Sequence, residues 1–325
     1  MKAHIVVVGS LNMDLVVRAH HIPQPGETVI GGDFLTLPGG KGANQAVAAA
    51  RLGAEVSMIG RVGCDEFGDA LLDNLKTAGV DHSLTQQDPD APTGVAFIVV
   101  DDSGQNSIVV ASGANARLSP ADIKAAEDKI ASAALLLLQL ESPLDAVIRA
   151  AEVARQHNVK VILNPAPARP LPEALLALVD FLTPNESETA LLTGMPVDNL
   201  EQANAAASSL MRLGVGTVIL TLGARGALLA DNEGFRSFPA FKITPVDTTA
   251  AGDAFVGGVA VALGEGRSVA EAVQWGTAAG ALAATKMGAQ PSLPERGDLE
   301  RILREGTLEH PISESGVCQA ADPDI

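Results

Sequence analysis

The stretch Ala134–Leu163, ALLLLQLESPLDAVIRAAEVARQHNVKVIL, decides the fold class. Ala134–Leu140 and Val159–Leu163 are short and almost entirely apolar, as expected of strands that are buried on both faces. Leu144–His157, which separates them, has the length of a helix. A strand, a helix and a second strand in this order form a crossover unit, which joins two parallel strands of one sheet. The stretch therefore predicts an α/β fold.

The same alternation continues in both directions along the chain. The other predicted strands are Ile5–Gly9, Val56–Gly60, Phe181–Thr183 and Thr217–Thr221. The other predicted helices are Ala43–Leu52, Phe67–Ala78, Ile123–Ser132, Leu171–Val179, Ser187–Leu192 and Leu200–Leu213. This pattern predicts a Rossmann-like three-layer α/β/α domain with a mainly parallel central sheet. Ligands of such domains bind beyond the carboxyl ends of the strands.

Two stretches interrupt the alternation. Leu15–Leu37 mixes prolines and glycines with β-forming residues, and Gly94–Val110 contains two β-rich runs joined by the turn-like Asp101–Gly104. We expect both to form antiparallel strands that stand off the main sheet as one small subdomain. From the residues alone, a lid over a ligand site and an ordinary extension of the sheet edge are equally good explanations.

Composition limits the class of partner. The 325 residues suffice for one large domain or two modest ones. Acidic residues outnumber basic ones 39 to 22, for a net charge of −17, and 8 Phe and 1 Trp are accompanied by no Tyr. Nucleic-acid polymers are bound through Lys and Arg and through aromatic stacking, so we expect no nucleic-acid partner. A small anionic substrate is still compatible with this charge.

No membrane partner is expected either. No apolar run approaches the roughly 18 residues of a spanning helix, and the apolar run Ile5–Val8 is too short for a signal peptide. Cys64 and Cys318 lie far apart, which suits reduced thiols in the cytoplasm. Residues 305–325 carry five acidic residues and neither Lys nor Arg, so we expect a solvated acidic tail.

The strongest chemical signal is Asp247–Phe255, DTTAAGDAF, followed by an apolar helix to about Leu263. The first N–H groups of a helix have no partner within it and form an anion site. Asp253 would lie in the first turn, either as a helix cap or as a carboxylate that takes a proton. Capping is the commoner role, but the small residues Ala250–Gly252 permit a close ligand and favour function. The chain has no Walker A motif, which excludes a P-loop NTPase.

A second signal is Gly39–Ala46, GGKGANQA, at the start of a predicted helix. Glycines allow a ligand to approach the backbone closely. Lys41 and Asn44 are three residues apart, so they can face the same way on the first turn. Each has a structural explanation, as a solvated lysine and a helix-start hydrogen bond, but the cluster favours a binding loop.

Further polar groups follow predicted strands, where α/β ligand sites occur. Turn formation, helix capping or a tight turn would explain each of them about as well. One pair could instead orient hydrated Mg²⁺, and a glycine-rich turn could hold a nucleotide. These groups are Asn12 and Asp14, Glu141, the pair Asn185 and Glu188, and the turn Thr221–Gly226. The six histidines have no zinc-like spacing.

GGKGANQA and DTTAAGDAF resemble the two signatures of the PfkB-type carbohydrate kinases. The resemblance extends from Val6 to about Ser292 in the family's order, through the segments Gly9–Asp14, Pro25–Val29, Gln139–Pro143, Asn164–Ala168, Thr183–Glu188, Thr221–Gly226 and Gly288–Ser292. Lys41-Gly42, together with QLESP and NPAPA, is similar to the members of the family that phosphorylate ribose.

The resemblance implies a single kinase domain over residues 1–304, with a lid from about 12–38 and 94–112. It implies that D-ribose and ATP react to D-ribose 5-phosphate and ADP in ribose catabolism, with Mg²⁺ as cofactor and K⁺ as activating cation. It also implies a homodimer formed through the lid. Two alternatives are a related sugar or nucleoside kinase, for instance one that acts on deoxyribose or fructose, and a catalytically silent sugar-binding or regulatory protein with the same fold.

The resemblance also implies roles for individual residues. Asp253 would be the general base, and the N–H groups of Ala251, Gly252 and Asp253 would form the anion hole. The sugar would be held by Asn12, Met13, Asp14, Gly40, Lys41, Gly42, Ala43, Asn44, Glu141 and Asp253. The nucleotide would lie along Asn185, Thr221, Leu222, Gly223, Ala224, Arg225, Gly226, Gly252, Asp253 and Thr277. The monovalent cation would bind at Asp247, Thr249, Ala283, Lys286, Gly288 and Ser292, and Glu188 would position Mg²⁺ through water.

Overall fold

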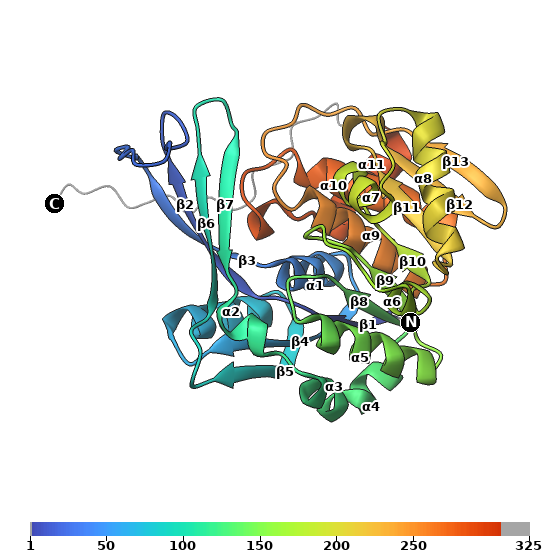
Figure 1. Cartoon of the computed structure of the whole chain (residues 1–325), viewed down its shortest axis with the longest axis horizontal. Coiled ribbons are helices and arrows are strands. Elements are labelled where there is room, and N and C mark those ends of the chain that lie inside the picture. The colour runs from blue at the N-terminus through green and yellow to red at the C-terminus, as the bar shows by residue number, and fades with distance from the viewer. Residues whose placement is uncertain (1, 307–325) are drawn as a thin grey trace.

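A nine-stranded sheet forms the centre of the computed structural model, which describes residues 2–306 (Figure 1). Its strands, in spatial order, are β13 (Gly234–Phe238), β12 (Ala227–Asp231), β11 (Thr217–Thr221), β10 (Phe181–Leu182), β9 (Lys160–Leu163), β8 (Leu135–Leu138), β1 (His4–Val8), β4 (Glu55–Gly63) and β5 (Val80–Asp88). All neighbours pair in parallel except at one edge, where β12 pairs antiparallel with both β11 and β13. The expected mainly parallel sheet is confirmed.

Helices cover both faces of this sheet. One face carries α1 (Lys41–Arg51), α2 (Glu66–Thr77), α9 (Ala251–Gly264), α10 (Val269–Ala283) and α11 (Arg296–Glu305). The other carries α3 (Pro120–Ala125), α4 (Glu127–Ala131), α5 (Leu144–Gln156), α6 (Glu173–Leu176), α7 (Glu186–Thr193) and α8 (Leu200–Arg212). Because side chains alternate along a strand, Ile5 and Val7 join the first core and Val6 and Val8 the second. The three-layer α/β/α prediction is confirmed.

A second sheet, the lid sheet, stands off the main body at the left of Figure 1. It contains β3 (Phe34–Gly39), β2 (Asn12–Arg18), β6 (Gly94–Val100) and β7 (Asn106–Ala111), in that order. Two antiparallel hairpins form it, as expected, but β2 and β6 pair in parallel where the hairpins meet. The chain enters β2 and β6 from the carboxyl ends of the parallel strands β1 and β5, which explains their common direction.

Several elements differ from the prediction. Ile123–Ser132 is two short helices separated at Ala126, and Leu171–Val179 contains only the four-residue α6. The strands β5, β12 and β13 and the helices α10 and α11 were not predicted. The edge strand β5 is largely polar and half-exposed, so it carries no apolar run. The tail prediction falls mainly on residues 307–325, outside the described residues. No helix within residues 2–306 is long and apolar enough to cross a membrane.

Candidate active site

The first turn of α9 presents backbone donors to a cavity at the carboxyl ends of the strands. Ala250 adopts the left-handed conformation (φ 58°), and the helix begins at Ala251. The N–H group of Ala251 donates to the carbonyl oxygen of Thr248 over 3.2 Å. The N–H groups of Gly252 and Asp253 have no protein acceptor among residues 2–306. The expected anion site therefore has two free donors, and the third, at Ala251, is already engaged.

Asp253 is buried beside these donors, with 7% of its surface exposed. Asn44 Nδ2 donates to its Oδ2 and Gln45 Nε2 donates to its Oδ1, each over 3.0 Å. The two amides reach it because α1 and α9 pack closely: a Cβ on Gly257 would lie 2.7 Å from the Cβ of Ala48. Burial raises the pKa of the Asp253 carboxyl, although Lys41 and the two amides favour its charged form.

Lys41, the first residue of α1, places a positive charge among carboxyl groups. Burial lowers the pKa of its ammonium, but Asp253, Glu141, Glu188 and Asp14 together outweigh this and raise it. Lys41 is therefore a fixed cation at neutral pH. A fixed cation next to unpartnered helix N–H groups is suited to an anionic ligand.

The residues expected to hold the sugar meet at the base of the lid sheet. Glu141 Oε2 accepts from Ser10 Oγ over 2.5 Å, from the Lys41 N–H over 3.1 Å and from Asn12 Nδ2 over 3.4 Å. Asp14 is 8% exposed, and burial, followed by the charges of Glu141 and Asp253, raises the pKa of its carboxyl to about 7.

Glycines and small residues make this close approach possible. A Cβ on Gly39 would lie 2.2 Å from the Asp14 carboxylate, and Gly40 has φ 87°. Gly42 and Ala43 face the strand–loop backbone, where the Ala43 N–H donates to the carbonyl oxygen of Ser10 over 2.9 Å. Met13 points into the hydrophobic core, so its side chain offers the site no polar group.

Only some of the residues that are expected to contact the nucleotide line one cavity. A cavity of about 220 Å³ extends from Lys41 and Asp253 to Asn185, Glu188 and Thr221, with Gly252 in its wall. Asn185 and Glu188 form a capping box at the start of α7, in which the Asn185 N–H donates to Glu188 Oε2 over 2.8 Å. Burial raises the pKa of the Glu188 carboxyl.

The rest of the expected nucleotide contacts lie outside the lining of this cavity. The turn 222–226 follows β11, and its Arg225 pairs with Glu186 and with the carbonyl oxygen of Asp198. The hydroxyl of Thr277 donates to the carbonyl oxygen of Val273 within α10, over 2.8 Å.

The expected cation-binding segments lie side by side. Asp247 Oδ2 accepts from the Gly288 N–H over 2.9 Å, and Asp247 Oδ1 accepts from the Thr249 N–H and hydroxyl. Burial acts against the charge of Asp247, but the bonds from Thr249 and Gly288 outweigh it and lower its pKa. The carbonyl oxygen of Ala283 accepts from the Lys286 N–H over 3.2 Å, and the hydroxyl of Ser292 donates to the carbonyl oxygen of Ala289. Carboxylate, hydroxyl and carbonyl oxygens are the ligands that hard cations prefer.

Sequence reasoning missed three amides of the site. Gln45 lies inside the GGKGANQA motif, and Asn164 lies inside the NPAPA segment that follows β9. Their places in these motifs could have identified both residues as members of the site. Gln45 Nε2 donates to Asn164 Oδ1 over 3.2 Å as well as to Asp253. The third, Asn115, follows the lid hairpin and belongs to no motif.

A buried carboxylate, free helix N–H groups and a fixed cation lie together at the carboxyl ends of the strands, an arrangement suited to an anionic ligand beside a proton acceptor. The chain matches the family model of the pfkB family carbohydrate kinases over residues 2–296. It is 45% identical over 303 residues to the ribokinase of Haemophilus influenzae, covering 93% of this chain and 99% of that protein. The chain belongs to the pfkB family, and it is a carbohydrate kinase, as predicted.

Two further comparisons bear on the substrate and the fold. The chain is 40% identical over 291 residues to the deoxyribokinase of Salmonella typhi, covering 89% of this chain and 95% of that protein. Its structure is similar to that of the Arabidopsis thaliana ribokinase complexed with ribose and ATP. The TM-score is 0.87 and the identity 35%, over 94% of this chain and 99% of that one.

Proposed function

We propose that this chain transfers the γ-phosphoryl group of ATP to the 5-hydroxyl of D-ribose, giving D-ribose 5-phosphate and ADP. One observation carries the proposal: Asp253 is buried where the polar cluster of Asn12, Asp14 and Glu141 meets the cavity that ends at Asn185. The names of the similar proteins, a ribokinase at 45% identity and a ribokinase complexed with ribose and ATP, support this substrate pair. Ribose catabolism in the cytoplasm is the corresponding cellular role.

In the proposed mechanism Asp253 acts as the general base. Its carboxylate takes the proton of the sugar hydroxyl, the hydroxyl oxygen forms a bond to the γ-phosphorus, and the bond from that phosphorus to ADP breaks. Negative charge on the transferring group is stabilised by the N–H groups of Gly252 and Asp253 and by Lys41. Asn44 and Gln45 hold the carboxylate in place for the proton transfer.

The residues present are compatible with Mg²⁺ bound together with ATP. Within residues 2–306 no group of three or more His, Cys, Asp or Glu side chains could hold a metal ion alone. Glu188 lines the cavity with a carboxylate and would hold Mg²⁺ through water, which suits an ion that keeps most of its waters. When bound, Mg²⁺ would neutralise charge on the phosphates.

The oxygen-rich loops are compatible with K⁺. Asp247 and Thr249, with the backbone at Ala283, Lys286 and Gly288 and with Ser292, would hold it. The hydrogen bonds from Thr249 and Gly288 and the charge of Arg18 keep Asp247 ionised, so it presents a negative charge to these loops. Asp247 and Thr249 lie four and two residues before the start of α9 at Ala251, so a cation bound there would add positive charge close to the anion site.

The outer face of the lid sheet supports a homodimer. Phe97 lies opposite Leu15 and Val109 in the register, and Phe34 lies opposite Val17, so all five side chains share one face. Phe34, Phe97 and Val109 are 63%, 51% and 66% exposed. An exposed apolar face of this kind is typical of a protein–protein contact, and a second copy of the chain would cover it.

A sugar panel with ATP and coupled detection of ADP tests the proposal. We expect the highest kcat/KM for D-ribose. The deoxyribokinase at 40% identity favours 2-deoxyribose as the second candidate. A higher kcat/KM for 2-deoxyribose than for ribose would overturn the substrate assignment and leave the kinase assignment in place.

A further inference from the structure

Asn115, in the 3₁₀ turn η1 (Gly113–Arg117) that follows β7, pairs with the backbone of Leu11. Its Oδ1 accepts from the Leu11 N–H over 2.9 Å, and its Nδ2 donates to the Leu11 carbonyl oxygen over 2.8 Å. The second hydrogen of Nδ2 is donated to Asn12 Oδ1 over 2.8 Å. Because one backbone donor and one backbone acceptor face the amide, its orientation is determined.

The orientation of Asn115 determines that of Asn12. Since Asn12 Oδ1 accepts from Asn115, Asn12 Nδ2 faces Glu141, whose Oε2 lies 3.4 Å away. A flipped Asn12 amide would place its oxygen against the Glu141 carboxylate and its NH₂ group against that of Asn115. Both Asn12 and Asn115 are 2% exposed, so water cannot readily replace the lost partners.

The hydrogen bond between the Asn12 and Asn115 side chains lies where the two hairpins of the lid sheet begin. Gly94, the first residue of β6, pairs with Asn12, the first residue of β2. A Cβ on Gly94 would lie 2.3 Å from Asn115 Nδ2 and 2.4 Å from Asn12 Oδ1. The side chains of Asn12 and Asn115 therefore pack directly against the backbone of Gly94, at the base of the lid sheet.

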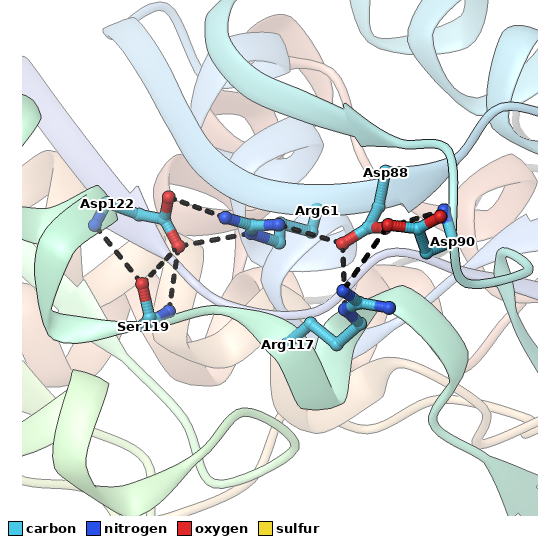
Figure 2. A network of polar contacts seen from close by, with 6 residues as sticks. All are labelled: Arg61, Asp88, Asp90, Arg117, Ser119 and Asp122. Carbon is cyan, nitrogen blue, oxygen red and sulfur yellow. Dashed lines mark hydrogen bonds and ion pairs between the residues drawn. The ribbon is translucent and has the colours of Figure 1, made fainter.

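A network of ion pairs holds η1 against the main sheet (Figure 2). Arg61 on β4 bonds to Asp88 on β5 and to Asp122 on α3, each over 2.8 Å, and Arg117 at the end of η1 reaches Asp88 over 3.1 Å. Asp122 also closes the capping box with Ser119 at the start of α3. Arg61, Asp88 and Asp122 are largely buried, with 19%, 2% and 8% of their side chains exposed, whereas Arg117 on η1 is 47% exposed. The buried part of the network therefore fixes β4, β5 and α3 together, and Arg117 adds a half-exposed link to η1.

We propose that Asn115 is a positioning residue for the sugar. It holds the Asn12 amide with its NH₂ group toward Glu141 and the sugar, and the Arg61 network keeps Asn115 at the base of the lid sheet. This inference rests on the proposed function, because Asn12 is there a sugar contact.

A double-mutant cycle tests the inference. In Asn115→Ala we expect the KM for the sugar to rise at least tenfold, while kcat and the KM for ATP stay within threefold of wild type. In an Asn12→Ala background, the same Asn115→Ala substitution should change the sugar KM less than twofold, because its effect passes through Asn12. Asn115→Ser serves for the cycle if the alanine variant does not fold.

Asn199→Ala is the matched control. Asn199 caps α8, on the far side of the molecule from the lid sheet, so its loss should lower stability without changing the sugar KM. A sugar KM that rises equally in both backgrounds, an equal rise in the ATP KM, or no rise at all would overturn the inference. Wild-type protein that fails to phosphorylate ribose contradicts the proposed substrate instead, and the cycle is then run with the sugar that it does phosphorylate. Wild-type protein that phosphorylates no sugar overturns both.

Discussion

Gln45 Nε2 donates a hydrogen bond to Asp253 Oδ1 over 3.0 Å, inside a chain of buried amides. Gln139 Nε2 donates to Gln45 Oε1 over 2.7 Å, which directs the NH₂ group of Gln45 toward the carboxylate. Gln45 and Gln139 have no exposed surface. The proposed base is therefore oriented by a side chain that is itself held in one orientation.

Gln45→Leu should move the acid limb of the pH–rate profile to higher pH. Burial already raises the pKa of Asp253, and the lost donor stabilised only the charged form, so the pKa rises further. The base must be ionised to act, so kcat should fall most at low pH. Loss of one such bond corresponds to a shift of roughly one pH unit. Profiles of kcat from pH 5 to 9 measure it, and an unmoved acid limb would show that Gln45 does not stabilise the ionised base.

Asp253→Asn should remove catalysis and spare binding. Asparagine keeps the shape and a partner for Asn44 or Gln45 but cannot accept the proton. We expect kcat to fall by about 10²–10⁴-fold, the usual contribution of a general base. The Kd for ribose, measured by calorimetry, should change only a few-fold. A variant with nearly normal kcat would exclude Asp253 as the base.

Asp14→Asn should weaken sugar binding and raise the free energy of unfolding. The folded carboxyl keeps its proton up to about pH 7, whereas a free Asp carboxyl loses it near pH 4. The free energy of unfolding of the wild type therefore falls between these pH values and is level above pH 7. Asparagine does not titrate, so the excess of its free energy of unfolding over that of the wild type should grow by about 3 kcal/mol from pH 5 to pH 8.

Urea denaturation of both proteins at pH 5 and pH 8 measures this difference. The sugar KM of Asp14→Asn should also rise about tenfold at pH 8, because a carboxylate accepts stronger hydrogen bonds than an amide. A stability difference independent of pH would contradict the raised pKa of Asp14. An unchanged sugar KM would remove Asp14 from the sugar site.

Periodicity predicted the layers, and polar residues after apolar strands predicted which side chains lie together at one end of the sheet, because both depend on local sequence. Ile5 and Val7 alternate with Val6 and Val8 in the sequence as they do between the two cores. The parallel pairing of β2 with β6 joins segments about 80 residues apart, and no local pattern encodes it. Asn115 was missed for the same reason: its partners Leu11 and Asn12 are more than 100 residues away.

Activity should depend on K⁺ through Asp247. We expect a higher kcat in KCl than in tetramethylammonium chloride of equal ionic strength. Asp247→Ala removes the one carboxylate of the cation loops, so it should abolish most of this difference and lower kcat in K⁺ to near the K⁺-free rate. Equal wild-type rates in the two salts would contradict the cation site. Glu233→Ala, at an exposed ion pair with Arg236 in the turn between β12 and β13, is a control that should retain the K⁺ response.

Val109→Lys should convert the proposed dimer to a monomer. Val109 is 66% exposed and lies opposite Phe97 on the apolar face of the lid sheet, so a lysine there places a charge within the proposed contact. An uncompensated charge buried in an interface costs several kcal/mol, enough to raise the dimer Kd by about a thousandfold. Light scattering after gel filtration measures the mass. Val246→Lys, at a valine that is 57% exposed and lies outside the lid sheet, should leave the mass unchanged. A wild type that is monomeric at every concentration, or a dimer that survives Val109→Lys, would show that this face does not form the contact.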